Sequence, residues 1–399
     1  MQLSFLEPLF DRPGPWATVY FGPGENDESG AKRRELSVRE ACRTLEEYGA
    51  DEATTQAVHD DLMGVSPAED PAGRVVFAAG GEVVLGHRLS RPPQRHITAW
   101  GPLPRLTPLL ELAGQDPVCL VAYVDRAGAD FEVRGAAGRP RDAGQVEGRQ
   151  RPMHRTPTAD WSERHFQLKA ENTWEHNADE IARALAGAYE ESGADLVVLV
   201  GDPRERPAVH DRLPDAVRGV TVETEHGGRA AGSSSPALEQ AIEQARSQYT
   251  RRHVDEVLER FRAGRVGTDR PTDAVEGVPA VVEAAREHRI DTLLIRPDGP
   301  DLSRETWVGA EPDQVAVRRT DAQILGESDP VSARADDALL RSAAVTTADV
   351  LVVPPLDPRN VSDAPEVFEA AEEGAGDDAD IPVGGLGALL RWTYEPTVR

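Results

Sequence analysis

The stretch from Arg134 to His165 carries the side chains best suited to chemistry. It holds seven arginines against four acidic residues, a formal charge of +3, whereas the rest of the chain carries 37 basic and 66 acidic side chains, a formal −29. A guanidinium group keeps its proton and binds phosphate oxygens in pairs. A long polar loop in a compact protein is usually functional or disordered. The pattern therefore predicts a local basic loop that binds a polyanion.

Nine residues of this loop are candidates for contact with RNA. Arginines would bind phosphates, a tryptophan would stack on bases, and two histidines would lie beside phosphates. The candidates are Arg139, Arg141, Arg149, Arg151, His154, Arg155, Trp161, Arg164 and His165. Catalysis by the two histidines is disfavoured, because a general base needs a positioned partner. A flexible linker without a function is the alternative interpretation.

Composition limits the possible classes of function. A net charge of −26 argues against broad nonspecific nucleic-acid binding, which needs an extended positive surface. Cys42 and Cys119 lack the spacing of a zinc site or a disulfide framework. Because there is no signal peptide pattern and no long apolar run, we expect a cytoplasmic protein without a membrane span. No metal, cofactor or catalytic residue is expected, and the sequence gives no evidence on the oligomeric state.

Hydrophobic patterning predicts an α/β protein of three domains that would position this loop. An α+β domain is expected over residues 1–114, a three-layer α/β middle domain over 115–264 with the basic loop at 134–165, and an α/β sandwich over 274–399. The expected strands and hairpins are 15–23, 73–89, 119–135, 194–202, 218–224, 291–299 and 384–394, and a helix runs into a buried strand over 335–357. The expected helices are 31–62 with a break near Gly49, 164–193, 204–216, 236–263 and 274–289. Residues 103–114 are expected to be a connector.

Two other motifs have weaker claims to chemistry. The Gly-rich stretch 226–229 precedes a helix and could cradle a phosphate at the helix N-terminus. We favour a plain connection, with Ser235 capping the helix and Pro236 in its first position, because the Lys-Ser/Thr of a phosphate loop is absent. Asp125 and Glu132 could form a metal pair. A turn-capping aspartate and an exposed strand glutamate are the favoured interpretation.

The order of the segments resembles the bacterial branch of the eukaryotic and archaeal release factor 1 and Pelota superfamily, in particular the actinobacterial Balon-like ribosome hibernation factors. VAYVDRAGADFEVRG, the basic loop and SERHFQLKAENTWEHNADEIA follow one another as in that superfamily's middle domain, where a hairpin leads into the catalytic loop and a long helix. ADLVVLVGDP is similar to the strand after that helix, and GGLGALLRW to the closing segment of the third domain. The resemblance covers residues 117–399 and implies an RNase H-like middle domain and an L7Ae-like C-terminal domain.

The chain departs from release factors at the tip of the loop. Release factors carry Gly-Gly-Gln there, and this sequence has no Gly-Gly-Gln; Thr158, Ala159 and Asp160 precede the helix start instead. The resemblance therefore implies a factor that binds the vacant A site and protects idle ribosomes without hydrolysis. Its implied partners are the 70S ribosome, through large-subunit rRNA and the decoding region, and elongation factor Tu.

Two other classes of function stay open. A peptidyl-tRNA hydrolase or release-type esterase would need a substitute group such as Gln150 or Gln167. A non-ribosomal acidic scaffold would have kept the fold and lost the RNA surface. Salt-dependent RNA binding separates this scaffold from the ribosomal factor, because phosphate contacts weaken as salt rises.

Overall fold

The structure is a computed structural model that divides into two compact units. Unit 1 comprises Met1–Gln115 and Val254–Arg399, and unit 2 comprises Asp116–His253. The described residues are 3–22, 28–66, 68, 70–113, 117–135, 141–147, 162–229, 235–265, 272–353 and 382–394, without the side chains of 4, 28, 29, 113, 162–173, 393 and 394. Compactness alone does not define domains, so the division into three domains stays a prediction. None of the described helices is long and apolar enough to cross a membrane.

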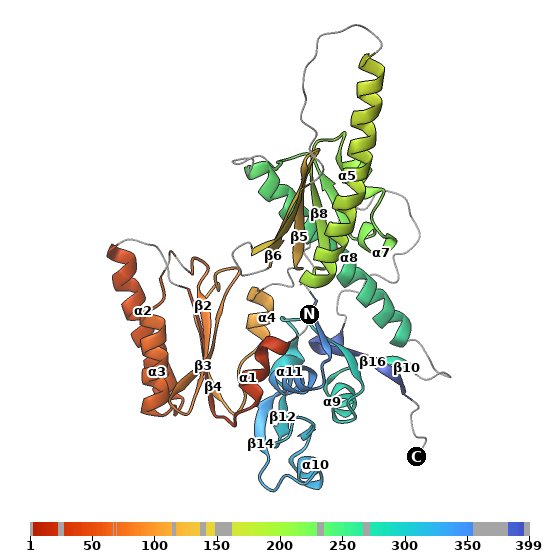
Figure 1. The fold of residues 1–399 in the computed structure, drawn as a ribbon. Helices are drawn as coiled ribbons and strands as arrows, with labels where there is room; N and C mark the ends of the chain where they lie inside the picture. Colours follow the sequence, from red (N-terminus) through yellow and green to blue (C-terminus); the bar gives the residue numbers. More distant parts are fainter. Residues whose placement is uncertain are drawn as a thin grey trace, which may run out of the picture. The chain divides into compact units, whose positions relative to one another are not determined.

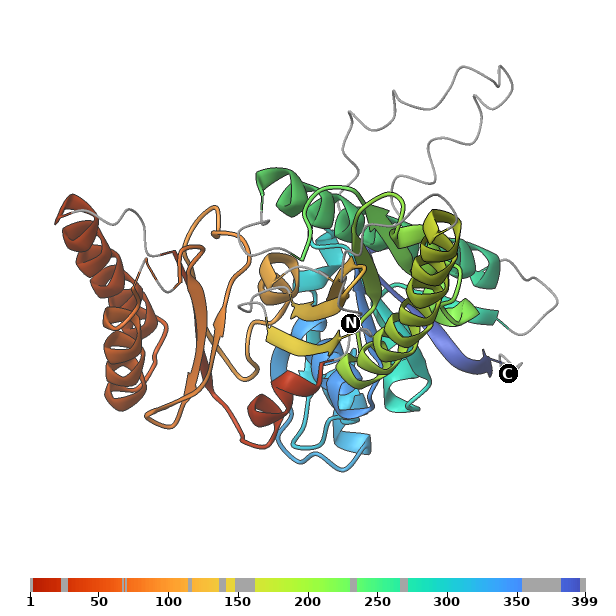
Figure 2. The same cartoon turned by 45° about the horizontal axis from the view of Figure 1, so that its top comes forward.

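The N-terminal part of unit 1 is an antiparallel sheet with helices on one face. Within the described residues its strand order is β3-β2-β1-β4. The strands are β1 (Trp16–Phe21), β2 (Arg74–Ala79), β3 (Glu82–Arg88) and β4 (Ile97–Gly101). Ala17, Val19 and Phe21 of β1 pack against α2 (Glu28–Glu47) and α3 (Glu52–Met63), which lie along one side of the sheet (Figure 2). Trp16 and Tyr20 point to the opposite face, because successive strand residues alternate.

The C-terminal part of unit 1 shares a hydrophobic core with the face of the N-terminal sheet that carries Trp16 and Tyr20. Its larger sheet has the order β10-β16-β11-β15, and a smaller sheet has the order β13-β12-β14. These strands are β10 (Thr272–Glu276), β11 (Ile290–Ile295), β12 (Glu305–Val308), β13 (Val315–Ala316), β14 (Val331–Arg334), β15 (Asp349–Val352) and β16 (Leu386–Tyr394). The helices are α9 (Val278–Arg286), α10 (Arg319–Ile324) and α11 (Ala335–Val345), and the N-terminal part adds η1 (Ser4–Leu6), α1 (Glu7–Phe10) and α4 (Thr107–Ala113). One hydrophobic cluster joins Trp16, Tyr20 and Leu106 to Leu293 and Leu339.

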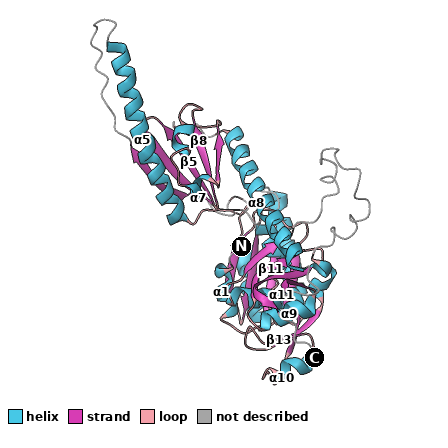
Figure 3. Cartoon of the chain, turned by 90° about the vertical axis from the view of Figure 1, so that its right-hand side faces the viewer, coloured by secondary structure: helices cyan, strands magenta, loops and turns pink. Residues whose placement is uncertain are grey.

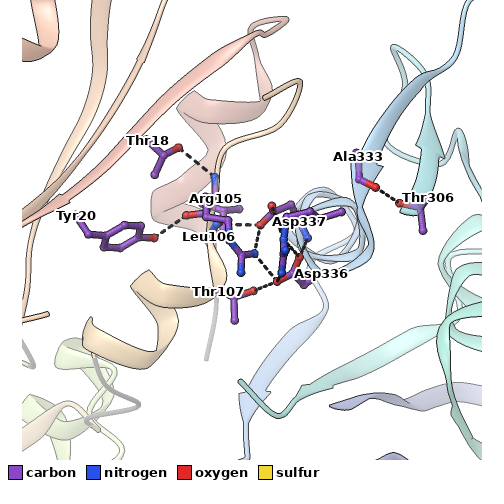
Figure 4. Close-up of polar contacts among 10 residues, drawn as sticks. Thr18, Tyr20, Arg105, Leu106, Thr107, Thr306, Ala333, Asp336 and Asp337 are labelled. Carbon is purple, nitrogen blue, oxygen red and sulfur yellow. Dashed lines mark hydrogen bonds and ion pairs between the residues drawn. The ribbon is translucent and has the colours of Figure 1, made fainter. Parts of the chain in front are cut away.

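A buried polar network also joins the two parts of unit 1 (Figure 4). The Arg105 guanidinium bonds Asp336 Oδ2 and lies 3.2 Å from Asp337 Oδ1. Asp337 Oδ1 also accepts from the Leu106 backbone N–H at 3.1 Å, and Asp336 is fully buried. The Tyr20 hydroxyl donates to the Arg105 carbonyl at 2.6 Å. Strand β1 therefore fixes the backbone of Arg105, whose side chain holds the first turn of α11.

Unit 2 is a three-layer α/β structure (Figure 3). Its sheet has the order β7-β6-β5-β8-β9, and β5, β8 and β9 are parallel. The elements are β5 (Cys119–Asp125), β6 (Gly128–Arg134), β7 (Arg141–Glu147), β8 (Leu196–Gly201), β9 (Thr221–Thr224), α5 (Ser162–Ser192), α6 (Arg206–His210), α7 (Asp215–Arg218) and α8 (Pro236–Arg265), of which the residues from Val254 onward belong to unit 1. Alternate residues of β5 pack with α5 on one face and with α8 on the other. Because both faces are covered, the central strands are apolar along their whole length.

The α/β fold class predicted from the sequence is confirmed, and so is the three-layer order of unit 2. Ser235 caps α8 as predicted, because its Oγ accepts from the Leu238 N–H at 3.2 Å. The RNase H-like and L7Ae-like assignments stay predictions. Several boundaries differ from those expected, and each difference has a local physical cause.

The main correction concerns the basic loop expected over 134–165. Arg134 ends β6, and residues 141–147 form β7, an edge strand that pairs with β6. Its mostly exposed side chains explain why the sequence shows no apolar alternation there. Similarly, residues 272–276 form β10 where a helix was expected from 274, because Gly277 with φ of 79° breaks the chain before α9. The connector 103–114 contains α4, and Pro214 divides the expected helix 204–216 into α6 and α7.

The stability of unit 1 should depend on pH through Asp337. Burial, and then the neighbouring Asp336 charge, raise the pKa of Asp337 to about 7, above the ordinary value of 3.8. The folded state therefore binds this proton more tightly than the unfolded chain, so its stabilising contribution is complete below about pH 4 and is lost as pH rises through about 7. Relative to Asp337→Asn, the wild type should gain about 1 kcal/mol in unfolding free energy from pH 8 to pH 6. Urea unfolding of both proteins at the two pH values measures this; equal pH dependence would contradict it.

The pairing of β7 with β6 should depend on Gly128. Its φ is 155°, and a Cβ built there would lie 2.0 Å from the Val146 carbonyl oxygen. Gly128→Ala should therefore destabilise unit 2 by about 2 kcal/mol and speed amide hydrogen exchange in β7. Gly187→Ala in α5 is the matched control, because an added Cβ meets no atom within 4 Å there. Unchanged exchange in β7 of the Gly128 variant would refute the prediction.

Candidate nucleic-acid interface

The helix α5 is much longer than the sheet it packs on. Its 31 residues span about 46 Å, whereas the seven residues of β5 span about 23 Å. The buried Asn177 marks where the helix passes the sheet edge, because its side chain donates to the Arg126 carbonyl in the β5–β6 turn at 3.0 Å. Residues 162–176, called the arm below, therefore extend about 22 Å beyond this turn. Figure 1 shows the same end of α5 projecting past β5 and β8.

The arm and the end of β7 flank the most basic part of the predicted loop. Residues 148–161, called the basic segment below, connect Glu147 to Ser162 and contain three arginines and one aspartate. The basic segment and residues 136–140 lie outside the described residues, and with them Arg139, Arg149, Gln150, Arg151, His154, Arg155 and Trp161. Arg164 and His165 lie in the first turn of α5, and the side chains of both, like that of Gln167, are outside the description.

Arg141 is the one predicted contact residue whose side chain is described, and it lies apart from the basic segment. It is exposed at the start of β7, opposite Val133, whereas the basic segment begins after Glu147 at the other end of the strand. Six steps along a strand separate Arg141 from Glu147 by about 20 Å. The structure therefore does not bring Arg141 together with the arm.

Arg134, which the sequence groups with the loop arginines, is already engaged in ion pairs. Its guanidinium contacts Glu132 at 3.0 Å and Glu239 at 2.7 Å, and it donates to the Tyr123 hydroxyl at 3.0 Å. Only 15 % of its side chain is exposed. Burial raises the pKa of the nearby Cys119 thiol to about 12, so this cluster offers no thiolate nucleophile at neutral pH. We assign it a structural role.

The β5–β6 turn lies at the sheet edge from which the arm projects. Asp125 caps this turn as predicted, because its Oδ1 accepts from the backbone N–H groups of Ala127 at 2.7 Å and Gly128 at 2.9 Å. Arg126 in the turn pairs with Glu205 at 2.8 Å. Glu132 is half-buried beside Arg134 and is not the exposed strand residue we expected. Neither acid faces a metal-like group of ligands, and no such cluster occurs among the described residues.

The Gly-rich stretch 226–229 reaches this turn as well. Arg229 Nε lies 3.0 Å from Asp130 Oδ2, and its Nη1 lies 3.4 Å from Asp125 Oδ1. The hydrogen bond to Asp130 is the main reason that the pKa of Arg229 is raised above its ordinary value. The guanidinium is therefore held by two carboxylates, which makes this stretch an internal tie between β9 and the turn. Residues 230–234 that follow it are outside the described part of the chain.

Sequence reasoning missed Asn177, although the sequence contains a signal for it. Asn177 follows Trp174 by three residues and precedes Ile181 by four, so it lies on the apolar stripe of α5. A polar residue on a buried stripe needs a hydrogen-bond partner. The backbone carbonyl of Arg126, which no sequence pattern can reveal, supplies it.

Comparisons with known proteins show that the middle segment of the chain is similar to one family. Residues 118–266, which contain the sheet of unit 2, α5 and α8, match the family described as "Bacterial archaeo-eukaryotic release factor family 2". Two proteins of Mycobacterium tuberculosis, both described as uncharacterized, are 27 % identical over 401 residues and cover 98 % of this chain and 97 % of their own length: MT2704 of strain CDC 1551 / Oshkosh and Rv2629 of strain H37Rv.

Solved structures align over much of the chain but superpose poorly. An archaeal translation termination factor, aRF1, aligns over 97 % of this chain and 96 % of its own, with 16 % identity and a TM-score of 0.24. Archaeal Pelota from a ribosome-bound assembly with ABCE1 aligns over 81 % of this chain and 78 % of its own, with 14 % identity and a TM-score of 0.40. Such scores support no conclusion, so the assignment rests on the sequence match of the middle segment. By that match, the middle segment of the chain, residues 118–266, is similar to the bacterial branch of the archaeo-eukaryotic release factor family.

Proposed function

We propose that this protein is a ribosome-associated factor that binds the vacant A site and protects idle ribosomes without releasing a peptide. Two facts support a role in translation: the family match over 118–266 and the position of the basic segment between β7 and α5. The observation that carries the proposal is the arm, which holds one end of the basic segment about 22 Å beyond the sheet edge.

The length of the arm matters because the protein is strongly acidic. A net charge of −26 repels RNA at close range. At physiological salt, however, a charge is screened over about 8 Å. The end of the basic segment that joins α5 lies about 22 Å from the sheet edge and therefore experiences little of the repulsion from the body, whereas its other end continues from Glu147 at that edge. The three arginines and one aspartate of residues 148–161 give it a formal +2 of its own.

The absence of Gly-Gly-Gln supports the second part of the proposal, namely that the protein releases no peptide. Release chemistry in this superfamily uses that motif at the loop tip, and the sequence contains no Gly-Gly-Gln. The basic segment instead supplies groups that bind RNA: Arg149, Arg151 and Arg155 for phosphates and Trp161 for stacking on bases. Within this proposal, the contacted partners are large-subunit rRNA and the decoding region of the 70S ribosome, with elongation factor Tu as a second protein partner.

Co-sedimentation with 70S ribosomes from starved cells tests the proposal. The wild-type protein should migrate with the ribosomes, and the triple variant Arg149/Arg151/Arg155→Ala should bind at least about tenfold more weakly at physiological salt. The slope of log K against log salt concentration should fall by about 2 to 3, because three phosphate contacts are lost. Arg141→Ala is the matched control, since it removes an exposed arginine of the same unit at the far end of β7.

The outcomes separate the competing functions. If the wild-type protein does not migrate with ribosomes, or if the triple variant binds like the wild type, the proposal is wrong. Labelled peptide released from peptidyl-tRNA on stalled ribosomes, at a rate above buffer, would indicate the esterase instead. A protein that binds neither ribosomes nor RNA would be the acidic scaffold.

A further inference from the structure

We infer that the β5–β6 turn is a clamp that sets the direction of the arm, and that Asn177 and Arg229 are positioning residues for RNA binding. The clamp comprises residues 125–128 and the side chains that hold them. This inference rests on the proposed function, because it explains how the basic segment would be aimed. The clamp itself is a structural claim that can be tested without the ribosome.

The first element of the clamp holds the helix. Asn177 is 2 % exposed and donates to the Arg126 carbonyl at 3.0 Å, at the level where α5 leaves the sheet. The arm beyond it acts as a lever of about 22 Å. A tilt of about 10° at Asn177 would displace residue 162 by about 4 Å, whereas binding sites need their groups held within about 0.5 Å. The contact at the base of the arm therefore controls where residue 162, to which the basic segment is joined, is held.

The second element holds the other end of the basic segment. Gly128 pairs with Glu147, the last residue of β7, from which the basic segment continues. The close approach of Gly128 to the Val146 carbonyl leaves no room for a Cβ. One turn thus contacts both the strand that enters the basic segment and the helix that leaves it.

The third element ties the turn to the rest of the sheet. Arg229, from the stretch after β9, pairs with Asp130 at 3.0 Å and with Asp125 at 3.4 Å. Asp125 in turn accepts the two backbone N–H groups of the turn. From the segment after β8, Glu205 pairs with Arg126 at 2.8 Å. With contacts from α5, β7 and the segments that follow β8 and β9, the turn cannot shift independently of the sheet.

The test combines Asn177→Leu and Arg229→Ala in the full-length protein. Leucine has the same number and branching of side-chain heavy atoms as asparagine and suits the apolar stripe of α5, so it removes the hydrogen bond without opening a cavity. We expect both variants to bind ribosomes about tenfold more weakly, with the thermal midpoint of Asn177→Leu unchanged or raised. The slope of log K against log salt concentration should equal that of the wild type, because no arginine of the basic segment is lost. Amide exchange in residues 119–134 and 174–185 should be about fivefold faster.

Two further variants serve as controls. Arg212→Ala removes a 2.8 Å ion pair with Asp179 of α5 that does not involve the turn, and it should match the wild type within about twofold. Arg229→Lys keeps the charge and should restore part of the affinity for ribosomes that Arg229→Ala loses.

Three outcomes would contradict parts of the inference. Amide exchange rates equal to those of the wild type in both Asn177→Leu and Arg229→Ala would overturn the clamp, whatever the measured affinity for ribosomes. Faster exchange with undiminished ribosome affinity would overturn the positioning role. If the wild-type protein does not bind ribosomes, the proposed function is wrong. The amide exchange rates would then still show whether the turn acts as a clamp on α5.

Discussion

A length mismatch between one helix and the sheet beneath it determines how unit 2 can act. The strands β5 and β8 have seven and six residues, and α5 has 31. A helix of that length cannot bury its whole apolar stripe on so short a sheet. Among the described side chains of α5, Trp174 and residues from Ala178 to Tyr189 contact the core, and Figure 1 shows the N-terminal turns of the helix extending beyond the sheet. The basic segment directly precedes the free end of this helix.

Charge and geometry then act together. In an acidic protein, cationic groups bind a polyanion more readily when they are kept away from the protein's own negative surface. Distance achieves this in salt solution, because screening removes the long-range repulsion from the body over about 8 Å. The basic segment continues from Glu147 at the same sheet edge as Asp125, Asp130 and Glu205, and the structure pairs these three acids with Arg229 and Arg126. The acids near the base of the arm are thereby neutralised locally.

Unit 1 is organised by a different constraint. Its N-terminal and C-terminal parts are far apart in the sequence, and a shared hydrophobic cluster joins them with a buried charged network at its edge. Arg105 compensates Asp336 and Asp337 at the first turn of α11, where negative charge is also favoured by the helix dipole. Buried charges without partners are costly, so this pairing favours one relative placement of the two parts of unit 1.

The sequence by itself determined the element types wherever both faces of an element are buried. The apolar run of β8, the hairpin of β5 and β6, the stripe of α5 and the cap at Ser235 all follow from local spacing. It also established the basic segment and the missing Gly-Gly-Gln, which need no coordinates. The edge strand β7 was not predicted from the sequence, because an exposed strand carries no alternating apolar pattern. Only the tertiary structure decided that Arg134 is paired, that Arg141 lies about 20 Å from the basic segment, and that Asn177 and Arg229 meet at one turn. The physical reason is that these contacts join residues 51 to 105 positions apart, and the packing of the sheet sets which backbone carbonyl or carboxylate meets a given side chain.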